Sequence, residues 1–204
     1  MAPEGFQRAT GVSRETLARL EAYAALLAKW QRRINLVSAA SMDDLWRRHM
    51  LDSAQLFPYL PGSFARLVDL GSGAGFPGLV LAILGAGGVE LIESDGRKCA
   101  FLAEAARVTE TAVTIHNARI EALAAAPADV ITARALAPLT KLLASAEPFL
   151  TCGSVCLFLK GAGVDEELTS AAKEWNMRAS RHPSTTDPRG VVLHIQGIIR
   201  ERRR

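Results

Sequence analysis

The stretch LVDLGSGAGFPG, residues 67–78, decides the fold of this chain. It runs from a short apolar segment into a loop with four glycines in eight residues. Because glycine has no Cβ, such a loop lets a ligand approach the backbone closely. In an open α/β sheet, ligands bind beyond the carboxyl ends of the strands, where the chain turns into a helix. The stretch therefore predicts a ligand site at the first strand-to-helix turn of an α/β sheet.

The spacing of the glycines favours one class of ligand. A dinucleotide-binding loop reads G-x-G-x-x-G, and its last glycine lets the helix pack close to the strand. Here Gly71, Gly73 and Gly75 give G-x-G-x-G, and Phe76 occupies the position of that last glycine. This is a misfit for NAD, whereas S-adenosylmethionine, which has no pyrophosphate, suits the tighter spacing. A tight connection without any ligand is the alternative interpretation.

An acidic residue ends the next apolar run. Glu93 lies eighteen residues after Gly75, where a carboxylate can accept hydrogen bonds from both hydroxyls of a ribose. NAD and S-adenosylmethionine both carry a ribose, so Glu93 does not distinguish them. A solvated acid at a strand end is the alternative.

Short apolar runs alternate with helical stretches from residue 67 onwards. This alternation is typical of βαβ units around a parallel sheet that is buried on both faces. A helix is expected around residues 166–175, followed by a closing antiparallel hairpin from 177–180 and 191–199. We therefore predict an α/β, Rossmann-like fold with a seven-stranded, mostly parallel sheet and helices on both faces. The parallel strands are expected at 67–70, 89–93, 113–116, 129–132 and 155–160.

The first 60 residues are predicted to be an N-terminal helical extension that caps the substrate side of a core at residues 61–204. After Ser13, a favourable N-cap, apolar residues recur at three- and four-residue steps as far as Ile34. A second helix is expected to start at Ser41, with Asp44 as its capping-box partner, and to end before Pro58.

The composition is that of an ordinary globular protein. Hydrophobic residues make up 49% and charged residues 22%, and the net charge of +3 mildly favours anionic partners. The apolar runs fall short of the roughly 20 residues that cross a membrane, and no secretory signal stands at the start. We therefore expect a cytoplasmic protein, and we expect it to be a monomer. Cys99, Cys152 and Cys156 lack paired zinc spacing, so no metal is expected. Cys152 and Cys156 are expected to be buried on one face of a strand.

Several separated motifs carry a more specific signal than the glycine loop. The motifs beside that loop are NL at 35–36, RHMLDS at 48–53, ESDGRK at 93–98, RIE at 119–121, ARAL at 133–136 and FLKG at 158–161. With them, residues 34–199 resemble the bacterial small-subunit ribosomal RNA guanine-N7 methyltransferases, also called glucose-inhibited division protein B. The chain departs from this family at Ala74, where proline or another small residue is frequent, and at Glu93, where aspartate is frequent.

The resemblance implies a class I, S-adenosylmethionine-dependent methyltransferase that acts on N7 of a guanine, position 527, in 16S ribosomal RNA. Phe76 would cover the apolar face of the cofactor, Ile120 and Glu121 would flank its adenine, and Arg134 would hold its carboxylate or an acceptor on the guanine. A helix start and a structural ion pair are the alternatives for Ile120–Glu121 and for Arg134. The implied cofactor contacts are Gly71, Gly73, Phe76, Glu93, Ile120, Glu121 and Arg134.

Methyl transfer to N7 uses a ring lone pair that carries no proton, so it requires alignment and no general base. His116, His182 and His194 are expected to be structural, so none of them is expected to act as a general base. This agrees with a reaction that needs none. His49, Asp52 and Ser53 are spaced to share a helix face with Arg48 nearby, and we interpret this face as closing over the cleft. A surface salt bridge is the alternative. The candidates for positioning the substrate are Arg134, His49 and Lys160, the last as a phosphate contact.

Basic clusters are predicted to hold the RNA, as naked 16S RNA or within the small subunit. Each cluster on its own is equally consistent with ordinary surface charge. Turnover of a small molecule, or a nucleotide-binding regulatory module without catalysis, stays open as an alternative function. The RNA candidates are Asn35, Arg47, Arg48, Asp52, Ser53, Arg97, Lys98, Arg202, Arg203 and Arg204, with Arg32 and Arg33 as a further basic pair.

Overall fold

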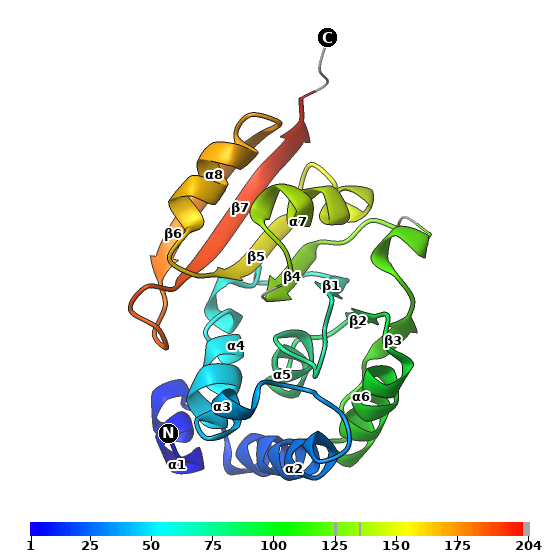
Figure 1. The fold of residues 1–204 in the computed structure, drawn as a ribbon, viewed down its shortest axis with the longest axis vertical. Helices are drawn as coiled ribbons and strands as arrows, with labels where there is room; N and C mark the ends of the chain where they lie inside the picture. The colour runs from blue at the N-terminus through cyan, green and yellow to red at the C-terminus, as the bar shows by residue number, and fades with distance from the viewer. Residues whose placement is uncertain (125, 135, 202–204) are drawn as a thin grey trace.

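A seven-stranded sheet forms the centre of the molecule (Figure 1). The computed structural model describes residues 1–124, 126–134 and 136–201. The strand order is β3-β2-β1-β4-β5-β7-β6, and only β7 pairs antiparallel with its neighbours β5 and β6. This confirms the predicted Rossmann-like sheet and its closing hairpin. The strands are β1 (Leu67–Leu70), β2 (Val89–Glu93), β3 (Thr114–Asn117), β4 (Val130–Arg134), β5 (Val155–Lys160), β6 (Trp175–Pro183) and β7 (Val191–Arg200).

Helices cover both faces of the sheet, as the continuously apolar strands predict. Successive residues of β1 point to opposite faces, so Leu67 belongs to one apolar core and Val68 to the other. The first core packs under α2 (Arg14–Gln31), α5 (Gly78–Ile83) and α6 (Gly96–Val108), and the second under α7 (Leu139–Ala146) and α8 (Val164–Ala171) (Figure 1). The open edge beyond the carboxyl ends of the parallel strands is left for a ligand.

The N-terminal helices pack directly against the glycine loop. Ser13 caps α2 as predicted, since its side chain accepts a hydrogen bond from the backbone N–H of Thr16. The Tyr23 hydroxyl, on α2, donates to the carbonyl of Ala74 inside the loop. A further helix, α1 (Pro3–Thr10), precedes α2 and was not predicted, because its single buried apolar residue, Phe6, gives no periodic pattern. The division into an extension at 1–60 and a core at 61–204 stays a prediction.

The predicted second helix is wrong in its start and its continuity. The segment is broken into α3 (Ala39–Met42), a π-helical turn, η1 (Trp46–Leu51), and α4 (Asp52–Ala54). Ser41 lies inside α3, and the Asp44 side chain pairs with the amino terminus and with Arg47 in place of a cap. One long-range ion pair, with the amino terminus, and one local pair, with Arg47, thus occupy the carboxylate that capping would use.

Two smaller expectations are also corrected. Cys152 is exposed in the turn before β5, so only Cys99 and Cys156 are buried thiols. The helix expected up to residue 175 ends at Ala171, and Trp175 begins β6 as a buried anchor. Among the described residues, no helix is long and apolar enough to cross a membrane. The same residues hold no cluster of three metal-binding side chains.

Candidate active site

The glycine loop between β1 and α5 has the tight path that its sequence predicts. Gly71, Gly73 and Gly75 have φ angles of 65°, 56° and 97°, a region that side chains with a Cβ rarely adopt. At Gly78, a Cβ would lie 2.7 Å from the Cβ of Asp69 and 2.5 Å from Leu91. Gly78 therefore provides the close packing of helix on strand that the third glycine of a dinucleotide loop provides elsewhere.

Asp69 anchors the loop from beneath. Its carboxylate accepts from the Thr132 hydroxyl at 2.7 Å and from the backbone N–H of Gly78 at 3.2 Å. The side chain is fully buried, and burial raises its pKa from the ordinary 3.8 to about 6. Sequence reasoning passed over Asp69, although a lone acid inside an apolar strand was a visible signal.

The raised pKa of Asp69 predicts a pH-dependent stability. Because its folded-state pKa lies above the unfolded value, its favourable contribution is complete below about pH 4 and is lost as the pH rises through about 6. The lost stability amounts to about 3 kcal/mol. We expect Asp69→Asn, which cannot ionise, to remove this part of the decline in urea unfolding between pH 4 and pH 7. Parallel pH profiles for the two proteins would contradict the assignment.

The first cavity, of about 520 Å³, lies beyond the carboxyl ends of β1, β2 and β4. Of the seven predicted cofactor contacts, the structure brings six to its wall. Phe76 is the seventh, and it is buried beneath Arg134, with its ring 4.8 Å from that of His49 and 5.5 Å from that of Tyr23. The six in the wall are Gly71, Gly73, Glu93, Ile120, Glu121 and Arg134.

Glu93 joins the glycine loop to the turn after β2. One carboxylate oxygen accepts from the N–H of Gly73 at 2.9 Å and the other from the N–H of Asp95 at 2.8 Å. The side chain is thereby fixed at the cavity wall, with lone pairs left on both oxygens. A Cβ on Gly73 would meet no atom closer than 3.9 Å, so the loop leaves free space beside Glu93. These features fit the ribose of a nucleoside ligand.

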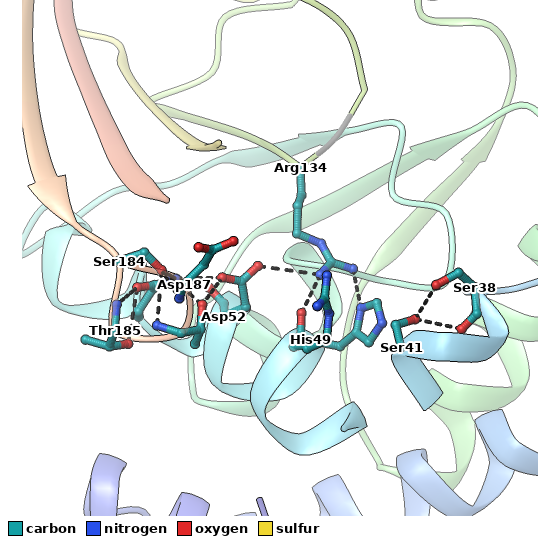
Figure 2. Close-up of polar contacts among 11 residues, drawn as sticks. Ser38, Ser41, His49, Asp52, Arg134, Ser184, Thr185 and Asp187 are labelled. Atoms are coloured by element: carbon teal, nitrogen blue, oxygen red, sulfur yellow. Dashed lines mark hydrogen bonds and ion pairs between the residues drawn. The ribbon is translucent and has the colours of Figure 1, made fainter. Parts of the chain in front are cut away.

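Arg134, at the end of β4, joins the two sides of the site. Figure 2 shows its side chain reaching between His49 and Asp52. Its Nη1 donates to the carbonyl of Arg48 at 2.9 Å, its Nη2 bonds Nδ1 of His49 at 2.6 Å, and Oδ2 of Asp52 lies 3.5 Å from Nη1. The guanidinium also lies over the Phe76 ring, 5.0 Å from its centroid. Arg134 is therefore held in one orientation from three directions.

His49 is a neutral partner of Arg134. Burial, together with the charges of Arg134 and Arg48, lowers the pKa of His49 from 6.5 to about 3. Because a guanidinium can only donate, Nδ1 accepts and Nε2 carries the proton. His49 thus has no free basic nitrogen for proton transfer, in line with a reaction that needs none.

The second cavity, of about 530 Å³, lies on the other side of Arg134. Its walls come from α3, η1 and the turn between β6 and β7, far apart in the sequence. Asp52 joins these walls, since its Oδ1 accepts from the Thr186 hydroxyl at 2.6 Å and from the Gln55 amide at 2.8 Å. The sequence marked the β6–β7 turn only as a turn. The residues lining this cavity are Ser38, Ser41, Arg47, Arg48, His49, Asp52, Arg134, Thr186, Asp187, Pro188 and Arg189.

Two predicted substrate contacts are placed differently. Ser53 is fully buried, so it does not line the second cavity with His49 and Asp52 and does not contact RNA directly. Lys160 is not an exposed lysine, because its ammonium donates to the carbonyl of Ala137 at 3.0 Å and pairs with Glu167 at 2.5 Å. The ammonium of Lys160 is therefore already paired within the protein, and a phosphate contact by this residue stays a prediction.

The basic clusters are spread over several surfaces. Arg47 and Arg48 line the second cavity, whereas Lys98 lines the first and Arg97 pairs with Asp95 at its rim. Asn35, Arg32 and Arg33 are exposed on the segment after α2. The terminal arginines 202, 203 and 204 lie outside the described residues.

The histidines expected to be structural have local partners. His116 bonds Glu90 at 2.7 Å. The His182 ring packs on Tyr59 at 4.4 Å between centroids, and His194 lies 6.4 Å from His182. All three are away from both cavities.

Solved structures share this architecture. A ribosomal protein L11 methylase from Lactobacillus delbrueckii subsp. bulgaricus superposes with a TM-score of 0.60 at 16% identity, over 71% of this chain and 76% of that chain. A TehB-like S-adenosylmethionine-dependent methyltransferase from Corynebacterium glutamicum superposes with a TM-score of 0.58 at 17% identity, over 87% and 99%. The sheet order, the glycine loop and the acid at the end of β2 therefore define a class I methyltransferase fold.

Sequence comparison narrows this class to one family. A family model described as rRNA small subunit methyltransferase G matches residues 16–195, so the chain belongs to that family. The ribosomal RNA small subunit methyltransferase G of Paramagnetospirillum magneticum is 63% identical over 99% of this chain and 98% of its own length. That of Rhodospirillum rubrum is 58% identical over 98% and 100%. The resemblance inferred from the separated motifs is confirmed.

Proposed function

We propose that this protein transfers a methyl group from S-adenosylmethionine to N7 of a guanine, position 527, in the RNA of the small ribosomal subunit. The observation that carries the proposal is the place of Arg134, whose side chain lines both cavities. A donor in the first cavity and a base in the second would meet at this residue. The names of the relatives support the choice of ribosomal RNA as substrate, and such a substrate places the protein in the cytoplasm.

The first cavity has the chemistry to bind the cofactor. When bound, S-adenosylmethionine supplies a methyl group on a positively charged sulfur. Glu93 would accept the ribose hydroxyls with the lone pairs that Gly73 and Asp95 leave free. Ile120 and Glu121, in the one-turn helix η3 (Ile120–Ala122), would flank the adenine. Gly71 and Gly73 leave room for the amino-acid part along the loop.

The residues around the second cavity align the acceptor and take no proton from it. The lone pair of N7 lies in the ring plane and is available at neutral pH. His49 already accepts from Arg134, and Asp52 is held by Thr186 and Gln55. The rate enhancement therefore comes from proximity and from a fixed electrostatic environment.

Two measurements test this function and separate it from the alternatives. Calorimetric titration is expected to show binding of S-adenosylmethionine and none of NAD. Radioactive methyl is then expected in 16S RNA, offered naked and as small subunits from a strain that lacks the enzyme, with the label mapped to a single guanine. Turnover of small molecules without RNA, or cofactor binding without any transfer, would overturn the proposal in favour of a small-molecule enzyme or a regulatory module.

A further inference from the structure

We propose that the second cavity seats the target guanine and that the adjacent pair of Arg134 and Asp52 reads its O6–N1–N2 edge. This inference rests on the proposed function and adds the residues that select guanine. It depends on three features of the described structure. These are a carboxylate oxygen with acceptor capacity to spare, guanidinium N–H groups without an acceptor, and the order in which they follow the first cavity.

Asp52 presents one oxygen to the second cavity. Its Oδ1 is occupied by the Thr186 hydroxyl at 2.6 Å and by the Gln55 amide at 2.8 Å. Among the described residues its Oδ2 is in contact only with Arg134, at 3.5 Å, which is at the long end for a hydrogen bond. The Asp52 side chain lines the second cavity and is 19% exposed, and we assign Oδ2, the oxygen that neither Thr186 nor Gln55 occupies, as the acceptor for a ligand in this cavity.

The hairpin turn and α4 fix the direction of that oxygen. The side-chain amide of Gln55 donates from Nε2 to both Asp52 and Ser184. Its Oε1 accepts from the backbone N–H of Thr185 at 2.9 Å. Figure 2 shows this network on one side of Asp52 and Arg134 on the other. The carboxylate is therefore preorganised by residues 130 positions apart in the chain, and ordering it on binding costs little.

Arg134 has further hydrogen-bond donors close to this oxygen. A guanidinium has five N–H groups. One donates to Arg48, one bonds His49, and one points toward Asp52. Within residues 1–124, 126–134 and 136–201, Nε–H and the second Nη2–H have no acceptor. Either is available to an acceptor atom of a ligand.

The order of these groups matches guanine and opposes adenine. Around the guanine ring come N7, then the acceptor O6, then the donors N1–H and N2–H. With N7 directed at the first cavity, O6 would fall against Arg134, and N1–H and N2–H, whose nitrogens are both bonded to C2, would fall against Oδ2 of Asp52. Adenine presents an amine at the O6 position and an acceptor at N1, so it would leave buried polar groups unpaired on both residues. Pyrimidines have no N7.

The remaining charges of the second cavity suit a nucleotide within a strand. Arg47, Arg48 and Arg189 line its walls, and all three are exposed. Asp187 is the other carboxylate in the wall, and its Oδ1 accepts from the N–H of Arg189 within the turn. The arginines would neutralise the phosphates that flank an unstacked base.

The inference is tested with altered bases at the target position. 16S RNA is ligated from two pieces that place guanosine, inosine or 2-aminopurine riboside there, and is offered in the form that the wild-type enzyme methylates. Inosine lacks only the N2 amine, whereas 2-aminopurine keeps that amine but lacks O6 and N1–H. For wild-type enzyme we expect kcat/KM to fall about tenfold with inosine and more than about a hundredfold with 2-aminopurine.

Asp52→Asn is expected to change this pattern and not merely the rate. The amide offers a donor where the carboxylate offered an acceptor, so the inosine penalty should disappear and the 2-aminopurine penalty should shrink at least tenfold. Asp187→Asn, which alters the other carboxylate of the same cavity, should keep both wild-type penalties. Partial misfolding of a variant lowers the rate on every RNA by the same factor, so the ratios between RNAs report only the folded fraction, which carries the substitution.

The outcomes distinguish a failure of this inference from a failure of the proposed methyltransferase function. Unchanged penalties in Asp52→Asn, or penalties that vanish in Asp187→Asn instead, would overturn the role of Asp52 while leaving the methyltransferase function intact. Wild-type enzyme that labels no guanosine-containing RNA would overturn the proposed function itself.

Discussion

Arg134→Ala is expected to lower kcat/KM for RNA methylation by at least about a hundredfold. The substitution removes the only side chain that lines both cavities among the described residues. It also leaves the Asp52 carboxylate without its nearby cation and Nδ1 of His49 without its donor. Truncating one partner of such a fixed charged group costs about 2–5 kcal/mol, which is the size of effect seen when one preorganised donor is lost from an active site.

A matched control separates this effect from lost stability. Arg66 is buried to a similar degree, with 22% of its side chain exposed against 17% for Arg134. It likewise pairs with a carboxylate, Glu90, and lies over an aromatic ring, that of Phe149. Arg66 directly precedes β1, however, and so lies at the amino ends of the parallel strands, whereas both cavities lie beyond the carboxyl ends. Arg66→Ala should lower the melting temperature and spare methylation.

The single-turnover rate and circular dichroism check the expectation for Arg134. Arg134→Lys should recover only part of the rate, because an ammonium keeps the charge but loses the planar fork that bonds Arg48 and His49 together. If Arg134→Ala kept more than a tenth of the wild-type rate with its fold intact, Arg134 would not belong to the reacting site.

Local sequence signals sufficed for the sheet and the first cavity. The alternation of apolar runs and helices fixes a parallel sheet, and its strand ends bring Gly71, Glu93 and Arg134 to one edge without knowledge of any long-range contact. Ser13 could be assigned because an N-cap depends only on residues within one helical turn.

Local spacing placed His49, Asp52 and Arg48 over the cleft, and they line the second cavity, but it did not predict the contacts that complete this cavity. Asp52 receives one of its partners, Thr186, from the β6–β7 turn, 134 positions away. Ser53 next to it turns inward because η1 is a π-helix, which shifts the faces that a regular helix would present. The Asp44 carboxylate pairs with the amino terminus and does not cap the expected helix. For Asp52 and Asp44 a long-range contact decides where the side chain points, and for Ser53 the irregular helix does, and neither is visible in local periodicity.

Gly73→Val is expected to lower the affinity for S-adenosylmethionine by at least about fifty-fold. Residue 73 has a φ of 56°, which is costly for a β-branched side chain by about 1–3 kcal/mol. The new side chain would also occupy the free space of the loop beside Glu93, and any shift of the loop to relieve strain would weaken the bond from the Gly73 N–H to that carboxylate. Calorimetric titration measures the loss directly.

Gly11→Val separates the backbone strain from the blocked cavity. Gly11 ends α1 with a φ of 71°, and a Cβ there meets nothing within 4 Å. Both substitutions therefore impose a similar conformational cost, but only residue 73 lines the first cavity. Both variants should unfold at similarly reduced temperatures, while Gly11→Val binds cofactor as the wild-type protein does. Equal cofactor affinities for the two variants would mean that the glycine loop is a structural connection alone and that the cofactor, if bound, lies elsewhere.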